Sequence, residues 1–584
     1  MLVRHRGGEW VLHSPRAEEV FTPEDLDDFQ REVARTVGEF VRREVLPVLP
    51  AMEQHDFSHN VRLLRQLGEL ELAGPSVPEA YGGQGLDKIT GMVVLEALGP
   101  SGAFSVTYGA HTGIGTLPIV FFGNQAQKEK YLPALATAEK IAAYCLTEPN
   151  SGSDALGART TARLSPDGRS WILNGAKQWI TNGGFADVFI VYAKVDGDKF
   201  SAFIVERDAP GLSTGKEEHK MGIHGSSTRS VIMQDCTIPV ENLLHEVGKG
   251  HHIAFNILNI GRFMLGAGVL GGAKQVARIA TKYAQERQQF GKAIAEFPLI
   301  QQKLAEMAVR LYAAESAAYR TAALLDEGLS EIDHGAESAG RQSTQVLQEY
   351  VVECSIVKVL GSEVLDFVTD EAVQIHGGYG FMEEYEVCRA YRDSRINRIF
   401  EGTNEINRML ITGDLLKKGL KGQLPLMAAI GGLQDELMAF TPRLFDGATP
   451  LEQERWLHES ARKIALMVAG LGVQKYGMAM DQEQELLAGI ADLLIDIYAM
   501  ESALLRAEKH PSTMRRDLAT AFCHDAFTRV EATARTLLAS VSEGDTLRTQ
   551  LAILRKLTRR EPVDTIHLKR RIAQEVLQAG GYVV

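Results

Sequence analysis

The chain has 584 residues, of which 45% are hydrophobic and 23% are charged, a composition that is ordinary for a globular protein. At roughly 150 residues per domain, this length predicts three or four domains. A formal net charge of -13 argues against a nucleic-acid-binding protein, because such a surface would repel phosphates unless a local basic patch overrode the repulsion.

The cysteines and the N-terminal segment favour a cytoplasmic protein. The five cysteines are scattered and odd in number, which is typical of reduced thiols and fits neither a disulfide framework nor a zinc site. The N-terminal segment lacks the continuous apolar core of a signal peptide, and the most apolar window, residues 263–273, is short and glycine-rich. We therefore expect a cytoplasmic protein with no metal site.

Helical spacing dominates the first zone of the chain, residues 1–139. Between residues 24 and 49 apolar side chains recur at the spacing of an amphipathic helix, which Pro47 and Pro50 are expected to end. In the second zone, residues 140–246, short apolar runs such as DVFIVYAKV are separated by Gly, Asp and Asn. This pattern predicts a small β domain.

Helical spacing returns in the third zone, residues 247–420. A pause rich in glycine and proline then introduces a fourth zone, residues 421–584, which is helical to its end. Because strands and helices are segregated along the chain, the sequence predicts an α+β fold. Its four parts are an N-terminal helical domain, a central small β-barrel or β domain, a four-helix bundle, and an additional C-terminal helical domain.

Two polar loops of the predicted β domain suit a flat or anionic ligand. YCLTEPNSGSD, residues 144–154, follows an apolar strand and offers hydroxyl groups and unpaired amides. In KQWITNGG, residues 177–184, Trp179 can stack on a ring system while the nearby Thr181 hydroxyl donates a hydrogen bond. Taken singly, each is more typical of a generic turn or of a core tryptophan.

Glu401 suits the role of a base. In RIFEGTNEI, residues 398–406, it lies between the apolar pair Ile399-Phe400 and the pair Gly402-Thr403. Dry neighbours would raise the pKa of its carboxyl group, as a base in a binding site requires. The alternative is that Glu401 caps the helix that follows, since carboxylates favour the first turn.

Five motifs together resemble, in order and spacing, those of the acyl-CoA dehydrogenase flavoproteins. They are YCLTEPNSGSD, KQWITNGG, ERQQFGK, QIHGGYGF and RIFEGTNEI. The resemblance implies one FAD per subunit, in a homodimer or a dimer of dimers. It also implies oxidation of an acyl-CoA to trans-2-enoyl-CoA in fatty-acid β-oxidation, with hydride transfer to flavin N5. An electron-transferring flavoprotein would then accept the electrons.

The resemblance also assigns roles to individual residues. The base that removes the α proton would be Glu401. The flavin of the same subunit would be lined by Tyr144, Leu146, Thr147, Gly152, Ser153, Trp179, Thr181, Thr403 and Asn404. The FAD of a neighbouring subunit would be held by Arg287, Phe290, Gln374, Gly377 and Gly378. The acyl-CoA would meet Ser153, Asn259, Arg262, Phe400 and Gly402.

Three features in which this sequence differs from some members of the family bear on the substrate and the base. Some relatives carry the base immediately before Arg262, where this chain has Gly261, so Glu401 remains the matching candidate. Asn259 and the long C-terminal zone resemble the very-long-chain branch, but Pro118 stands where that branch deepens its acyl tunnel with glycine. We expect long-chain substrates. The alternatives are an acyl-CoA oxidase that uses oxygen and a non-catalytic assembly or scaffold protein.

Two sets of basic residues have more than one interpretation. The C-terminal zone carries eight cations that suit contact with anionic lipid or with the phosphates of CoA, although a solvated face is the commoner reason for such a run. They are Arg548, Arg555, Lys556, Arg559, Arg560, Lys569, Arg570 and Arg571. Four arginines at three-residue intervals, Arg389 to Arg398, are expected to form ion pairs, with contact to CoA as the alternative.

Overall fold

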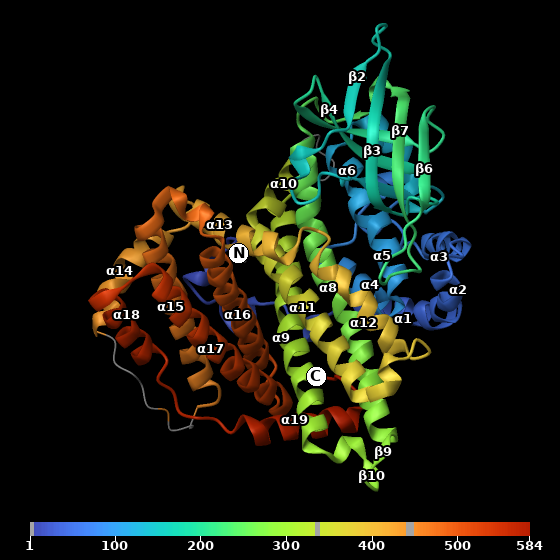
Figure 1. Cartoon of the computed structure of the whole chain (residues 1–584). Coiled ribbons are helices and arrows are strands. Elements are labelled where there is room, and N and C mark those ends of the chain that lie inside the picture. The colour runs from blue at the N-terminus through green and yellow to red at the C-terminus, as the bar shows by residue number, and fades with distance from the viewer. Residues whose placement is uncertain (1–4, 333–338, 440–444, 446–448) are drawn as a thin grey trace.

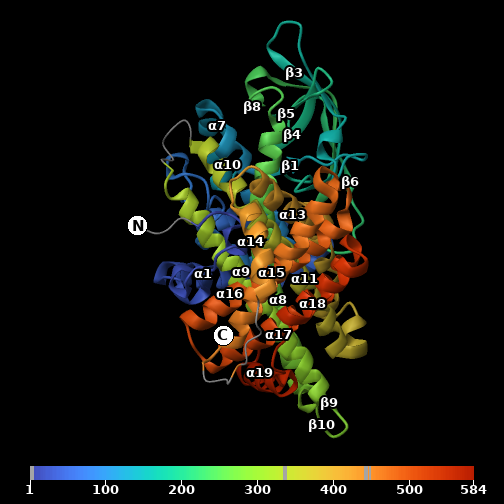
Figure 2. The same ribbon diagram turned by 90° about the vertical axis from the view of Figure 1, so that its left-hand side faces the viewer.

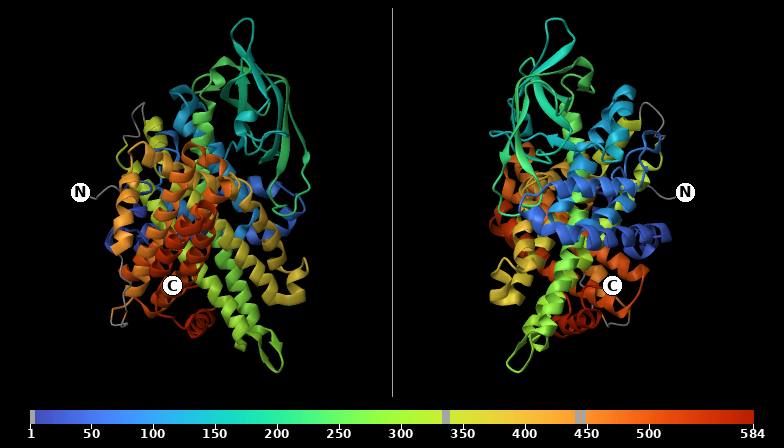
Figure 3. Two further views of the ribbon diagram at one scale, coloured as in Figure 1. Left: turned by 60° about the vertical axis from the view of Figure 1, so that its left-hand side comes forward. Right: turned by 90° about the vertical axis from the view of Figure 1, so that its right-hand side faces the viewer.

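The computed structural model describes residues 5–332, 339–439, 445 and 449–584. A helical bundle forms the middle of the molecule, the β domain stands at one end of it, and the C-terminal domain lies along one side (Figure 1). The N-terminal helices cover the side of the bundle that faces away from the C-terminal domain (Figure 3). The predicted α+β architecture is confirmed.

The N-terminal helices are short, and the longest of them has 13 residues. They are α1 (Asp28–Phe40), α2 (Leu49–Glu53), α3 (Ser58–Glu69), α4 (Lys88–Leu98), α5 (Ala103–Gly109), α6 (Leu117–Phe122) and α7 (Gln125–Ala136). The prediction that Pro50 ends a helix is wrong, because Pro50 lies in the first turn of α2. A proline is tolerated there since the first turn leaves its N–H groups unpaired in any case.

The β domain is one mixed sheet with the strand order β6-β7-β3-β2-β4-β5-β8, and β1 pairs with β4 in parallel. Its strands are β1 (Ala142–Cys145), β2 (Thr161–Leu164), β3 (Ser170–Thr181), β4 (Val188–Val195), β5 (Lys199–Glu206), β6 (Leu212–Glu217), β7 (Thr228–Pro239) and β8 (Leu243–Leu244). Alternate residues of β4 enter two different cores. Ile190 and Tyr192 pack with the helices, whereas Phe189 and Val191 belong to the interior of the β domain. Burial on both faces explains why this run is continuously apolar.

The bundle is built around long helices. They are α8 (Gly250–Glu286), α9 (Pro298–Leu329), α10 (Ala339–Glu349), α11 (Val351–His376), α12 (Glu386–Ser394) and α13 (Asn404–Leu420). A hairpin of β9 (Gln288–Gln289) and β10 (Lys292–Ala293) follows α8. By length and composition α8 could cross a membrane, since an 18-residue window of this helix has a mean hydropathy of 1.5. Because 67% of that apolar window is buried inside the protein, α8 is better explained as a core helix.

The C-terminal domain consists of six helices among the described residues. They are α14 (Leu426–Ala439), α15 (Glu452–Tyr476), α16 (Gln484–Lys509), α17 (Thr513–Val541), α18 (Gly544–Leu557) and α19 (Thr565–Ala579), and Figure 2 shows this domain from the front. Buried ion pairs fix it to the rest of the chain. Arg506 of α16 lies 2.6 Å from Glu315 of α9 and 2.9 Å from Glu24.

Half of the eight C-terminal cations form ion pairs within the folded chain. The pairs are Arg548–Asp545, Arg560–Glu531, Lys569–Asp525 and Arg571–Asp517, at 2.5 to 3.2 Å. Neutralisation of these charges lowers the attraction of this face for anionic lipid.

Candidate active site

Glu401 lies in the loop between the turn Arg395–Arg398 and α13, against α8. Its backbone is left-handed, with φ of 59°, a conformation that costs a non-glycine residue free energy. Oε2 of the carboxylate is buried and accepts no hydrogen bond from any residue that the structure describes. A buried carboxylate oxygen without a donor is unusual, because leaving it unpaired destabilises the folded protein.

Gly261 of α8 makes room for this carboxylate. A Cβ atom at residue 261 would lie 2.5 Å from Oε2 of Glu401 and 3.3 Å from the side chain of Ile114. Both values are too short for an undistorted contact, so only glycine leaves the carboxylate where it is. The two positions considered for the base therefore face each other in space.

The charge state of Glu401 is set by opposing effects. Burial raises the pKa of its carboxyl group to about 7, although the cations of Arg262 and Lys358 act in the opposite direction. Ile399 does not supply the dryness expected of it, because its side chain is 48% exposed. The carboxylate is instead buried against Gly261 of α8, which is distant in sequence.

The backbone around Glu401 is held by groups on two helices. Arg262 donates from Nε to the carbonyl of Glu401 at 3.3 Å and from Nη1 to Oδ1 of Asn259 at 2.6 Å. Thr403 accepts a hydrogen bond from the N–H of Ile406 and caps α13, so Glu401 is not the cap. The side chain of Asn404 is bound by residues of α11, among them Lys358.

The two polar loops of the β domain lie side by side. The N–H of Gln178 donates to the carbonyl of Thr147 at 2.8 Å. Lys177, which is fully buried, lies 2.7 Å from Glu148 and also donates to the carbonyl of Leu146 at 3.2 Å. Glu148 in turn accepts from the N–H groups of residues 159 and 160.

Both loops present groups that a flat, polar ligand can use. Trp179 has a left-handed backbone, with φ of 59°, beside a register shift in β3, and its side chain is 61% exposed. The hydroxyl group of Tyr144 is buried and makes no hydrogen bond with a described residue. Gly152 and Ser153 are exposed at the loop tip, whereas Leu146 is buried behind it. Thr181 ends β3 opposite Thr228.

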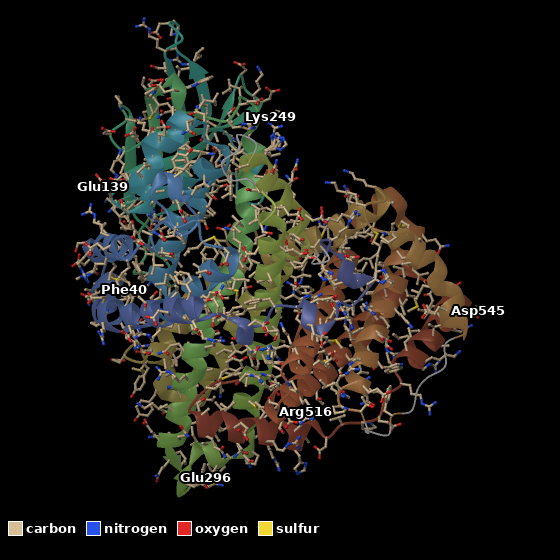
Figure 4. All side chains as sticks on the ribbon, turned by 180° about the vertical axis from the view of Figure 1, so that it is seen from behind. Phe40, Glu139, Lys249, Glu296, Arg516 and Asp545 are labelled. Atoms are coloured by element: carbon tan, nitrogen blue, oxygen red, sulfur yellow. The ribbon has the colours of Figure 1, made fainter. Side chains whose placement is uncertain are left out.

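The other predicted cofactor residues lie at the opposite end of the bundle. Arg287, Gly377 and Gly378 line a cavity of about 480 Å³ there, beside the exposed ring of Phe290. Figure 4 shows Glu296, which follows the hairpin, at this end and Lys249 beside the β domain. Gln374 is exposed on α11 and does not line this cavity. One chain therefore does not bring the two sets of residues together.

Two of the four spaced arginines form the ion pairs that were expected of them. Arg392 lies 3.1 Å from Glu383, and Arg398 lies 3.0 Å from Asp366. Contact of Arg389 or Arg395 with CoA stays a prediction.

Three residues that hold the site in place were missed by sequence reasoning. Lys177 and Glu148 lie within the two loop motifs, but only the folded chain shows that they pair. Lys358 is a single cation in the apolar run SIVKVLG of α11, and this isolation is the signal that could have found it.

Comparisons with known proteins match segments in all four parts of the chain. Residues 27–139 match "Acyl-CoA dehydrogenase, N-terminal domain", residues 143–236 match its middle domain, and residues 248–416 and 460–556 match two descriptions of its C-terminal domain. A probable acyl-CoA dehydrogenase of Bacillus subtilis (strain 168) is 53% identical over 99% of this chain and 98% of its own.

Similarity extends to a solved structure and to a mammalian enzyme. The crystal structure of an acyl-CoA dehydrogenase complexed with FAD from Bacillus anthracis is 53% identical, with a TM-score of 0.97 over 99% of this chain and 100% of that one. The mitochondrial very long-chain specific acyl-CoA dehydrogenase of Homo sapiens is 38% identical over 80% of this chain and 73% of its own. The chain belongs to the acyl-CoA dehydrogenase family.

Proposed function

We propose that this protein binds FAD and converts saturated long-chain acyl-CoA to trans-2-enoyl-CoA in fatty-acid β-oxidation, with Glu401 as the base that removes the α proton. The observation that carries the proposal is the carboxylate of Glu401, which is buried against Gly261 with one oxygen unpaired. A base must be dry and must have a free acceptor atom for the proton. FAD, when bound, supplies the acceptor for the hydride that leaves the β carbon.

The residues of the β domain fit a flavin. A ring system stacked on Trp179 would cover a large exposed side chain, and the unpaired hydroxyl group of Tyr144 would gain a partner. At the far cavity, Arg287 offers a cation, and glycines 377 and 378 have open space around them for a close-lying pyrophosphate. Because the two sets lie at opposite ends of the bundle, they support a homodimer, or a dimer of dimers, in which one FAD contacts two chains.

Glu401 would serve the reaction through two of its groups. Its Oε2 atom takes the α proton of the acyl thioester. Its N–H, which donates to no residue that the structure describes, is free to bind the thioester oxygen as negative charge develops on it. Arg262 donates to the carbonyl of the same residue and so helps to hold the loop of Glu401 against α8. Gly402 has φ of 81°, which glycine adopts without strain, so it allows the backbone turn beside Glu401. Contact of Gly402 and Phe400 with the substrate is part of the proposal.

Chain length and electron acceptor form the finer part of the proposal. Long-chain substrates are supported by the similarity to the very long-chain enzyme, which extends beyond the bundle into the C-terminal domain. A cavity between α4 and α8, lined by Leu95, Thr112 and Met264 among others, measures only about 30 Å³, so an acyl chain that entered it would have to displace side chains. An electron-transferring flavoprotein is the acceptor proposed here. Membrane contact has weaker support, because half of the C-terminal cations are paired.

Anaerobic titration of the purified protein with acyl-CoAs of increasing length tests the proposal. We expect a yellow protein whose flavin absorbance is bleached by saturated long-chain acyl-CoA, most completely by the preferred length. Oxygen is admitted afterwards and peroxide is measured, since rapid peroxide formation would identify an oxidase instead. A protein without flavin, or one that no acyl-CoA bleaches, would exclude the proposed activity.

Replacement of Gly261 with alanine tests the position of the base. The new methyl group would push the Glu401 carboxylate away, and we expect flavin reduction to slow by about tenfold to a hundredfold, because an error of about 1 Å in position has such effects. Stopped-flow absorbance measures the rate. Gly268→Ala is the matched control on the same helix, since a Cβ there has only ordinary contacts. Equal rates in both variants would contradict the proposed position.

A further inference from the structure

Lys358 is a buried cation next to the proposed base. It belongs to α11, its side chain has no exposed surface, and it reaches the loop that carries Glu401. Its Nζ donates to the carbonyl of Gly402 at 2.8 Å and to Oδ1 of Asn404 at 2.7 Å. A lysine is rarely buried to this degree without a specific partner.

The acceptor groups of Lys358 are themselves fixed by its own helix. The amide nitrogen of Asn404 donates to Oγ of Ser362 at 3.1 Å and to Oε1 of Glu363 at 3.2 Å. These two bonds use both donors of the Asn404 side chain, so its oxygen must face Lys358. The contact is therefore a built arrangement that joins α11 to the start of α13.

No carboxylate of the described residues lies close enough to Lys358 to form an ion pair with it. Among the ion pairs of the described residues, none places a carboxylate oxygen within 4.0 Å of its Nζ. Glu401 exerts the largest attraction on it of any acidic group. Two successive carbonyls, of residues 401 and 402, thus receive hydrogen bonds from two cations, Arg262 and Lys358. Both residues have left-handed backbones, with φ of 59° and 81°.

We propose that Lys358 is a positioning residue for the reaction: its amino group holds the Glu401-Gly402 backbone in its left-handed form and, when protonated, acts as the counter-charge of the base. This inference rests on the proposed role of Glu401. It assigns to Lys358 a charge function that a structural hydrogen bond alone would not have.

The surroundings of the pair support this assignment. Burial lowers the pKa of Lys358 to about 7, although Glu401 raises it, and burial raises the pKa of Glu401 to about 7, although Arg262 and Lys358 lower it. Loss of the cation must therefore make Glu401 harder to ionise. The other titratable or charged groups that face the pair are Arg262 from α8, Tyr144 from β1, Glu363 from α11 and Glu405 from α13. Cys354 of α11 faces Arg262.

Three substitutions in the FAD-loaded enzyme separate charge from hydrogen bonding. Lys358→Gln removes the charge but keeps a donor, Lys358→Met removes both, and Lys358→Arg keeps both. Lys418→Met is the matched control, because Lys418 is also buried and donates to backbone carbonyls, those of Gly7 and Glu349, away from Glu401. Melting temperature and flavin content report on folding.

The readout is the pH dependence of flavin reduction by acyl-CoA. The acid limb is the part of the rate-against-pH curve where the rate falls as pH is lowered. In Lys358→Gln and Lys358→Met we expect this limb to move to higher pH by about one unit or more, the size of effect that a nearby opposite charge has on the pKa of a carboxyl group. The rate should then be about tenfold lower near neutral pH and recover at alkaline pH. Lys358→Arg and Lys418→Met should keep the limb of the unchanged enzyme. Unmoved limbs in both neutral variants would overturn the proposal, even if their rates were uniformly lower.

Infrared difference spectroscopy of the enzyme without substrate gives a second readout that does not depend on turnover. A protonated carboxyl group gives a carbonyl band. The band that the unchanged enzyme shows and Glu401→Gln lacks belongs to Glu401, so its intensity at different pH values reports the titration of Glu401 alone. Its midpoint should move upward in Lys358→Gln. If Glu401→Gln still reduces its flavin normally, the proposed base is wrong whatever the band does. If the band does not move, the counter-charge is wrong even though the base is right.

Discussion

Replacement of Glu401 with glutamine is expected to slow anaerobic reduction of the flavin by acyl-CoA by about 10²- to 10⁴-fold, the contribution that a general base typically makes. Glutamine has the size of glutamate and fits beside Gly261, but it cannot accept the α proton. Stopped-flow absorbance at saturating acyl-CoA measures the rate. The bound flavin per chain should stay unchanged, because the predicted flavin contacts lie on other residues.

Glu405→Gln is the matched control for this substitution. Glu405 is an exposed carboxylate four residues further along the chain, in the first turn of α13. Water screens its charge from the buried pair, so its loss should leave the rate nearly unaltered. In the unchanged enzyme, the rate should fall as pH is lowered through about 7, because the raised pKa of Glu401 leaves the base protonated below that value. If Glu401→Gln retained its turnover, the proposed role of Glu401 as the base would be contradicted.

Local patterns carried the prediction of the fold and of the base. The switch from helical spacing to short apolar runs marks the β domain, and the start of α13 follows from the capping preference of Thr403. Glu401 could be singled out because its motif lies within a few residues. What surrounds it could not be singled out, since α8 comes 140 residues earlier in the chain and only tertiary packing places Gly261 against the carboxylate.

The error over Ile399 has the same origin. Two apolar residues before a carboxylate suggest a dry environment, but neighbours in a tight loop point in different directions, and Ile399 faces solvent. Lys358 and Lys177 were overlooked for a related reason. A cation inside an apolar helix or strand has no local partner to reveal its role, and both lysines act through residues at least 29 positions away.

Replacement of Lys177 with methionine should cost the β domain both stability and flavin. Removal of one partner leaves Glu148 as an uncompensated buried charge, and breaking such a pair typically costs about 3–5 kcal/mol. Because Glu148 also fixes residues 159 and 160, and Lys177 fixes the carbonyl of Leu146, the loop of residues 144–154 should lose its shape. We expect a clearly lower melting temperature and a lower ratio of flavin to protein absorbance.

Two further variants show whether the buried charge is the cause. Lys199→Met removes an exposed ion pair with Asp196 in the same domain and should change little, since exposed pairs contribute about 0–1 kcal/mol. The double variant Lys177→Met with Glu148→Gln should recover part of the lost stability, because it removes the stranded charge as well as its partner. Recovery of stability without recovery of flavin would separate two roles of the pair, one in folding and one in shaping the loop. A Lys177→Met protein with unchanged melting temperature and flavin content would show that the two loops are held together by their backbone hydrogen bonds alone.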